Sequence, residues 1–248
     1  MASDLSTPPA RMRAIAERVL LPLGIDGVLL VAICMFYSNT PLLTGLTGAL
    51  FCFTLLFRFS RSVLRLAALA TLFGAGGELL CTAPGINLWV YENPSFWNIP
   101  AWLPLIWPIL LITFTDLATF VHQQIAIHLR GRVYWSIVRL SQALAVVYAL
   151  YTLVRIQWVI ASVFLVFFVL LFLYARQPDS IVLFWVAAVG GSMGEYICIQ
   201  SGVWHYTRPF FAEFGVPLSL PLAWGLSANI ILLLTRTSLR RSRERKPG

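Results

Sequence analysis

Two glutamates, Glu78 and Glu195, stand at equivalent places in two similar stretches of this chain. Each has a glycine four residues before it and a cysteine three residues after it, and a Trp-x-Tyr segment follows. Residues spaced three and four apart share one face of a helix, and a glycine on that face lets a second helix approach closely. Each carboxyl group is therefore expected to lie against protein, where it could act as a general acid or carry a proton.

These stretches are two copies of an internal repeat. Residues 74–107 align with residues 191–224, and rare residue types such as Glu, Cys, Trp and Pro recur in the same order. We predict that the glutamates flank an outward-facing cavity, capped by aromatic loops that supply its substrate-binding residues. These candidates are Trp89, Tyr91, Trp107, Trp204, His205, Tyr206 and Trp224. The alternative is that the aromatic residues form a belt at the membrane interface while the glutamates only hydrogen-bond loop backbone.

The composition is that of a membrane protein. Of 248 residues, 59% are hydrophobic and 11% are charged, whereas soluble globular proteins carry about 25% charged residues. A membrane-spanning helix needs about 20 apolar residues, and the chain offers about eight such segments. They are residues 19–37, 41–57, 63–81, 101–121, 135–154, 157–174, 180–198 and 217–236. The segments are continuously apolar, so the sequence predicts an all-α, polytopic helical bundle rather than a transmembrane barrel.

The repeat divides the predicted helices into two groups of four. Residues 1–124 would form the first four-helix repeat, residues 125–240 the second, and residues 241–248 a basic cytoplasmic tail. An even number of crossings returns the chain to the side where it started. The two repeats should therefore be parallel, related by a two-fold axis along the membrane normal. Both motif loops, residues 82–100 and 199–216, are then expected on the non-cytoplasmic face.

The positions of Lys and Arg predict the orientation. All of the 18 cations except Arg155 and Arg208 fall in connections on one side of this arrangement. Because cytoplasmic loops are enriched in Lys and Arg, both termini are predicted to be cytoplasmic, in a cytoplasmic-type membrane. This rule, with attraction to anionic headgroups, explains the net charge of +8 and argues against a nucleic-acid partner. The N-terminus lacks the features of a cleaved signal peptide, so the first span should be an uncleaved anchor.

Two aspartates also fall inside predicted spans. Asp116 lies in the middle of the fourth span, where a carboxylate should be protonated or paired within the bundle. It is a third candidate for proton handling, catalysis or substrate binding. The alternative is a structural hydrogen bond to neighbouring threonines. Asp26 in the first span is a weaker candidate of the same kind, and Asn229 is expected to join helices.

Histidine and cysteine give no sign of a metal or redox centre. The three histidines show no metal-ligand spacing, and no phosphate loop, nucleophile elbow or Cys-x-x-Cys occurs, so no metal and no cofactor is predicted. Cys34 and Cys52 are expected to be buried small residues. Cys81 and Cys198 lie at the outer ends of their helices and could form a disulfide if the two-fold axis brings them together.

The second copy of the motif resembles the carotenoid hydratase family of integral membrane proteins. The resemblance rests on Glu195, on the turn Gly202-Val-Trp204-His-Tyr206, and on Val216-Pro217 followed by Pro221-Leu-Ala-Trp224 at the start of a helix. It covers about 30 residues, or about 60 with the first copy. The resemblance implies addition of water to the terminal double bond of an acyclic carotenoid, with Glu195, and by repeat Glu78, as candidate acids.

Three functions are compatible with these features. The favoured one is a membrane enzyme that acts on an isoprenoid or another lipid, in which a neutral carboxylic acid protonates an alkene or carbonyl. The second is a proton-coupled transporter of a small solute, with Glu78, Glu195 and Asp116 taking up protons. The third is a non-catalytic membrane subunit whose aromatic loops dock a partner. The oligomeric state is left open by the sequence.

Overall fold

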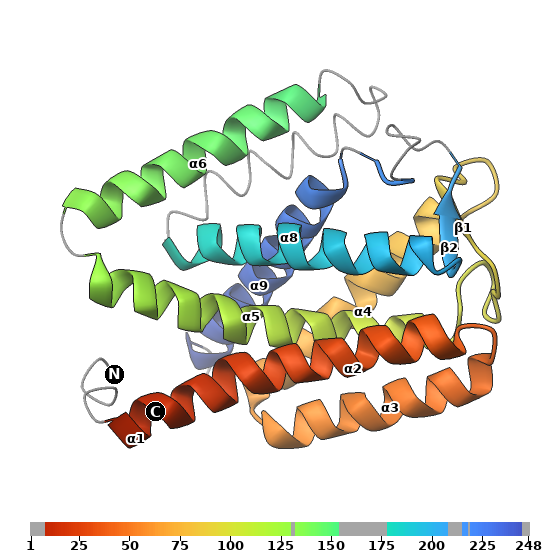
Figure 1. Ribbon diagram of the computed structural model, residues 1–248, viewed down its shortest axis with the longest axis horizontal. Helices are drawn as coiled ribbons and strands as arrows, with labels where there is room; N and C mark the ends of the chain where they lie inside the picture. The colour runs from red at the N-terminus through yellow and green to blue at the C-terminus, as the bar shows by residue number, and fades with distance from the viewer. Residues whose placement is uncertain (1–7, 130–131, 154–177, 208–214, 218, 245–248) are drawn as a thin grey trace.

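The computed structural model describes residues 8–129, 132–153, 178–207, 215–217 and 219–244, almost all of them helical (Figure 1). The all-α prediction is confirmed. The helices are α1 (Pro8–Ile15), α2 (Leu21–Phe36), α3 (Thr40–Phe57), α4 (Arg61–Cys81), α5 (Leu103–His128), α6 (Arg132–Leu153), α8 (Pro178–Gln200) and α9 (Leu220–Glu244). A single π-helical turn, η2 (Ala16–Leu20), joins α1 to α2. Two three-residue strands, β1 (Trp89–Tyr91) and β2 (Trp204–Tyr206), complete the described fold.

Five helical segments in these ranges are long and apolar enough to cross a membrane, as expected of an integral membrane protein. They are Met12–Phe36, Thr40–Phe57, Arg61–Cys81, Leu103–Ala126 and Asp179–Gln200. Two shorter apolar helices, Val133–Tyr148 and Leu220–Arg236, coincide with two further predicted spans. The eighth predicted span, residues 157–174, lies outside the described residues.

The helix starts follow from local capping. The Asn39 side chain accepts a hydrogen bond from the Leu42 backbone N–H at 3.2 Å, and the Ser60 hydroxyl accepts one from Val63 at 3.1 Å. These bonds satisfy donors that the first helical turn leaves unpaired. Pro104 and Pro221 are the second residues of α5 and α9, so both lie in the first turn, where a missing N–H costs nothing.

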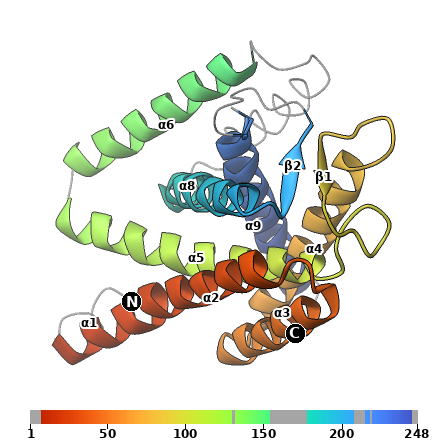
Figure 2. The ribbon, with the colours of Figure 1, turned by 45° about the vertical axis from the view of Figure 1, so that its right-hand side comes forward.

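The core of the bundle consists of α4, α5, α8 and α9. The closest pairs are α4 with α5 and α8 with α9, and these pairs also contact each other through α5–α8 and α4–α9. Helices α2 and α3 pack on the outer side of α5. Helix α6 lies on the other side of α8, away from α2 and α3 (Figure 2). The motif helices are therefore central, and the other helices flank them.

The two motif loops meet in an antiparallel β-ribbon at one end of the bundle (Figure 1). Trp89 pairs with Tyr206, Val90 with His205, and Tyr91 with Trp204. The ladder extends by one bond at each side, from Glu92 N–H to the Val203 carbonyl and from Thr207 N–H to the Leu88 carbonyl. The sequence predicted that both loops lie on one face, but not that they pair with each other.

Arginine side chains tie the connections together at the opposite end of the bundle. Arg58, at the end of α3, donates to the backbone carbonyl of Glu17 and forms an ion pair with Asp116 at 2.8 Å. Arg18 donates to the Gln123 side chain at 2.9 Å. The segment before α2, the end of α3 and the C-terminal part of α5 therefore gather at one end of the bundle. Which side of the membrane this end faces is still a prediction.

The Arg58–Asp116 pair should be a measurable stabilising contact. Both side chains are about three-quarters buried, with 21% and 27% of their surface exposed. We expect Arg58→Ala to lower the free energy of unfolding by about 1–3 kcal/mol, because it leaves the Asp116 charge unpaired among apolar side chains. Arg58→Ala combined with Asp116→Asn should be less destabilised than Arg58→Ala alone. Equilibrium unfolding in mixed micelles, analysed as a double-mutant cycle, checks this; additive effects would contradict it.

Candidate functional site

Glu195, near the end of α8, is held by a tyrosine and a tryptophan from its own copy of the motif. The Tyr206 hydroxyl, on β2, donates to Oε2 at 2.5 Å, and the Trp224 indole N–H, in the first turns of α9, donates to Oε1 at 2.6 Å. Each carboxyl oxygen thus accepts one hydrogen bond. The side chain is partly buried. Hydrogen bonds from two different elements fix the orientation of the carboxyl plane.

Glu78, near the end of α4, also has a tyrosine and a tryptophan as partners. Tyr91 O–H and Trp89 Nε1–H both donate to Oε2, at 2.8 and 3.0 Å. Only 9% of Glu78 is exposed. Both donors come from β1, so the ribbon holds the Glu78 carboxyl group, whereas β2 and α9 together hold that of Glu195.

The repeated glycines let the tryptophans reach the glutamates. A Cβ atom placed on Gly74 would lie 2.1 Å from the Trp107 ring, and one placed on Gly191 would lie 2.1 Å from the Trp224 ring. Each indole therefore crosses the motif helix at its glycine, one turn before the glutamate. The sequence predicted that a second helix would approach closely at these glycines; the structure places a tryptophan side chain from that helix over each of them.

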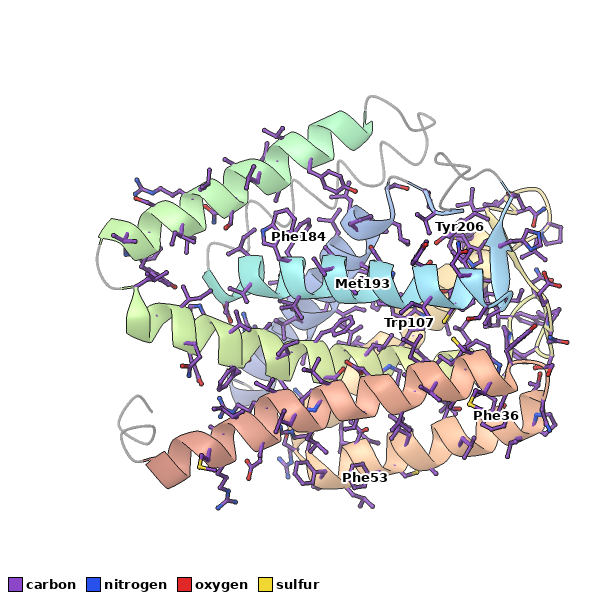
Figure 3. All side chains as sticks on the ribbon, viewed as in Figure 1. Phe36, Phe53, Trp107, Phe184, Met193 and Tyr206 are labelled. Atoms are coloured by element: carbon purple, nitrogen blue, oxygen red, sulfur yellow. The ribbon has the colours of Figure 1, made fainter. Side chains whose placement is uncertain are left out.

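The two centres meet through a pair of stacked indoles. The rings of Trp107 and Trp224 lie 4.7 Å apart with planes 21° from parallel. The Trp224 indole also donates to Glu195, and Trp107 packs over Gly74, one turn before Glu78. Trp107 and Tyr206 lie in the half of the bundle nearest the ribbon (Figure 3). Glu78 and Glu195 therefore belong to one continuous aromatic and acidic cluster, rather than to two separate sites.

The ribbon fixes the two phenols. Tyr91 packs against Trp204 at 5.5 Å between ring centroids, and Tyr206 packs edge-on against Trp89 at 5.4 Å. Burial, followed by the neighbouring glutamate, raises the pKa of the Tyr91 and Tyr206 hydroxyls well above their ordinary value. Both phenols therefore keep their protons at physiological pH and serve the carboxyl groups as donors.

Comparisons of the chain with protein-family models, with curated proteins and with solved structures gave no match. Its function must therefore be argued from the geometry of the cluster. That geometry joins six of the seven predicted aromatic and histidine candidates to the two glutamates, directly or through one ring contact. They are Trp89, Tyr91, Trp107, Trp204, Tyr206 and Trp224.

His205 is the candidate that lies elsewhere. Successive side chains of a strand point to opposite faces, so His205 faces away from its neighbours Trp204 and Tyr206. Its Nδ1 lies 3.1 Å from Glu92 Oε1, and 59% of His205 and 49% of Glu92 are exposed. The sequence singled out His205 for its closeness to Glu195 along the chain, whereas the structure pairs it with Glu92, which the sequence analysis had not considered.

Asp116 is also separated from the glutamates. It follows Trp107 by nine residues on α5, which is about 13 Å along the helix axis, and its partner is Arg58. The expectation that this carboxylate would be paired inside the bundle is confirmed. The nearby Thr113 hydroxyl lies 2.9 Å from a different acid, Asp26. The structure thus brings Glu78 and Glu195 together and leaves Asp116 at the arginine-rich end.

Trp102 is a cluster residue that the sequence analysis missed. It is 1% exposed and its ring meets Tyr91 edge-on at 6.3 Å. The equivalent position in the second copy is Ser219, so an argument from the repeat gave no reason to select it. By contrast, Trp97 is 77% exposed. It fits the alternative interpretation of the motif loops, an aromatic belt at the membrane interface.

Cysteines do not crosslink the two copies. All four lie in the described part of the chain and are free, Cys81 and Cys198 among them. Cys198 is buried and interacts with Cys34 of α2. Within the same ranges no group of three His, Cys, Asp or Glu side chains is placed to hold a metal ion. The two copies are joined in this region by the ribbon and by the stacked indoles.

Proposed function

We propose that the Glu78–Glu195 cluster is an acid site that binds a lipophilic substrate, an isoprenoid or another lipid, and acts on it by proton transfer. The observation that carries this proposal is the Glu195 carboxyl group held between the Tyr206 phenol and the Trp224 indole. Such a site offers a proton donor among aromatic faces and few other polar groups. That combination suits an apolar substrate better than a charged one.

The chemistry that fits is hydration of a carbon–carbon double bond. The Glu195 carboxyl group would give its proton to one alkene carbon, and the positive charge that forms on the other would be stabilised by aromatic faces. Water would attack that carbon and return a proton to the carboxylate, leaving an alcohol and the regenerated acid. The resemblance of residues 195–224 to carotenoid hydratases supports this reaction class.

The two glutamates would have different roles. Glu78 is almost fully buried and accepts hydrogen bonds from Trp89 and Tyr91, so it would hold these two side chains in place. Glu195 is only partly buried, which makes it the candidate catalytic acid. Asp116 would be a structural partner of Arg58 at the other end of the bundle.

We further propose that the protein consists of two parallel four-helix repeats with eight spans, with both termini cytoplasmic and the ribbon on the outer face. Equivalent contacts in the two copies support this arrangement: glycine against tryptophan, and glutamate bonded to tyrosine and to tryptophan. The clustering of arginines at the end away from the ribbon supports the orientation.

Product analysis with Glu195→Gln tests the enzymatic proposal. Lipophilic material that co-purifies with the protein is extracted and compared by mass spectrometry, after incubation in water enriched in heavy oxygen. The wild type should yield a hydroxylated product that carries the label. Glu195→Gln should reduce the yield about 100-fold or more, because general acid catalysis contributes roughly 10²–10⁴-fold. His205→Gln, on the opposite face of the ribbon, is the matched control and should behave as the wild type.

Equal labelling by the wild type and Glu195→Gln would refute the catalytic role. A second candidate is proton-coupled transport, favoured by the carboxyl groups of Asp26 and Asp116 inside the same helices that surround the cluster. It predicts pH-driven solute flux in liposomes without any labelled product. The two assays therefore separate the two functions.

A further inference from the structure

We propose that the groove between α2 and α3 is a binding site for one acyl chain of an anionic phospholipid, whose phosphate lies at the arginine-rich end. The groove has a volume of about 690 Å³, which falls within the range of roughly 300–1,000 Å³ that is typical of ligand pockets. It is lined from α2 by residues such as Gly24, Gly27 and Phe36, and from α3 by residues such as Ala49 and Phe53. Glu78 and Glu195 do not line it, so this site is separate from the acid cluster.

The walls of the groove are suited to hydrocarbon. Thr47 is the one lining residue with a polar side chain, and its hydroxyl already donates to the Leu43 carbonyl of its own helix at 2.8 Å. The groove therefore has no side-chain hydrogen bond to offer a ligand. Because α2 and α3 both belong to segments able to span a membrane, an open groove between them would face the hydrocarbon of the bilayer. A lipid chain is the material that lies there.

Glycine makes the groove deep. No atom lies within 4 Å of the Cβ positions of Gly24 and Gly27. This differs from Gly74 and Gly191, where a tryptophan ring fills the corresponding space. Leu29, which forms part of the floor, is 2% exposed and belongs to the same apolar cluster as Tyr91. Among the described residues, no side chain fills the space above the two α2 glycines, while the floor of the groove is packed.

Charge at one end of the groove favours an anionic headgroup. The groove runs from Phe36, at the ribbon end, to Phe53, nearer the arginine-rich end (Figure 3). About one helical turn beyond Phe53, Arg58 links α3 to the Glu17 carbonyl and to Asp116. Arg61, at the start of α4, is exposed there. Because only three residues separate Arg61 from the end of α3, a phosphate bound at Arg61 would lie near this end of the groove.

Lipid retention measured by native mass spectrometry tests the proposal. The purified full-length protein is delipidated, mixed with vesicles of phosphatidylglycerol or of phosphatidylcholine, and returned to detergent. The wild type should retain phosphatidylglycerol. Gly27→Leu, and independently Gly24→Leu, should weaken retention about tenfold by filling the groove. The control is Gly45→Leu, because Gly45 is equally open but does not line the groove; it should retain lipid as the wild type does.

The headgroup contact has its own variant. Arg61→Gln should reduce the preference for phosphatidylglycerol over phosphatidylcholine about fivefold, because one cation near an anionic headgroup contributes about 1 kcal/mol. Unchanged retention in Gly27→Leu and Gly24→Leu, or an equal loss in Gly45→Leu, would mean non-specific annular lipid and would overturn the proposal. Equal retention of the two lipids by the wild type would overturn the anionic assignment. Glu195→Gln should bind lipid normally, so failure of the lipid-site proposal and failure of the acid-catalysis proposal can be told apart.

Discussion

Replacing Gly191 with alanine is expected to prevent correct packing of α8 against α9. The added methyl group would lie 2.1 Å from the Trp224 ring. That ring cannot easily move aside, because it donates to Glu195 at 2.6 Å and stacks on Trp107 at 4.7 Å. Overpacking costs about 1–3 kcal/mol, and loss of the buried hydrogen bond adds about 1–3 kcal/mol. We expect a loss of stability of about 2–6 kcal/mol, measured by equilibrium unfolding in mixed micelles.

The matched control for this substitution lies on the same helix. Gly194→Ala adds the same methyl group three residues away, where no atom lies within 4 Å of the Cβ position. It should be neutral or slightly stabilising, because alanine favours a helix over glycine by about 1 kcal/mol. The pair Gly74→Ala and Gly77→Ala repeats the comparison in α4. Similar stability of Gly191→Ala and Gly194→Ala would show that the Trp224 ring does not fill the space above Gly191.

Removing the Glu78 carboxyl group is expected to have a comparably large effect. In Glu78→Leu, Tyr91 O–H and Trp89 Nε1–H lose their acceptor. An unsatisfied buried donor costs about 1–3 kcal/mol, so the two donors that share Oε2 account for about 2–6 kcal/mol. Thermal unfolding followed by circular dichroism measures the loss, and near-ultraviolet spectra report on the aromatic residues of the ribbon.

Glu78→Gln is the conservative comparison for Glu78→Leu. Its amide oxygen can still accept hydrogen bonds from Tyr91 and Trp89, so it should keep more than half of the stability that Glu78→Leu loses. Tyr91→Phe removes one donor together with its need for an acceptor, and should cost about 1 kcal/mol. If Glu78→Leu unfolded at the same temperature as the wild type, the hydrogen bonds to Glu78 would not stabilise the fold.

Much of the helical framework could be predicted because apolar length determines membrane-spanning segments. The predicted span 41–57 corresponds to Thr40–Phe57, and 63–81 corresponds to Arg61–Cys81. The repeat also indicated which residues belong together, since Glu78 and Glu195 accept hydrogen bonds from tyrosines at the same position of each copy, and equivalent tryptophans cover Gly74 and Gly191. The spans could be predicted from the apolar length of whole segments, and the repeat from matching residue types. Neither prediction requires knowing where a side chain points.

Contacts that depend on pairing between distant segments could not be predicted. The strands β1 and β2 have three residues each, too few to show an alternating pattern. Their pairing decides that Tyr91 and Tyr206 point toward the carboxyl groups while His205 points outward to Glu92. The link between Arg58 and Asp116 likewise depends on how α3 packs against α5. In each case the deciding information is a relative position in space, which one sequence does not contain.

The ribbon has a consequence for biosynthesis. Paired residues of its strands, such as Val90 and His205, are 115 positions apart along the chain, and a ribosome adds about 5–20 residues per second. The first strand therefore waits roughly 6–23 s for its partner, with its backbone groups unpaired. During this interval a nascent chain is open to pairing with the second strand of a neighbouring copy, which is the first step of a domain-swapped assembly.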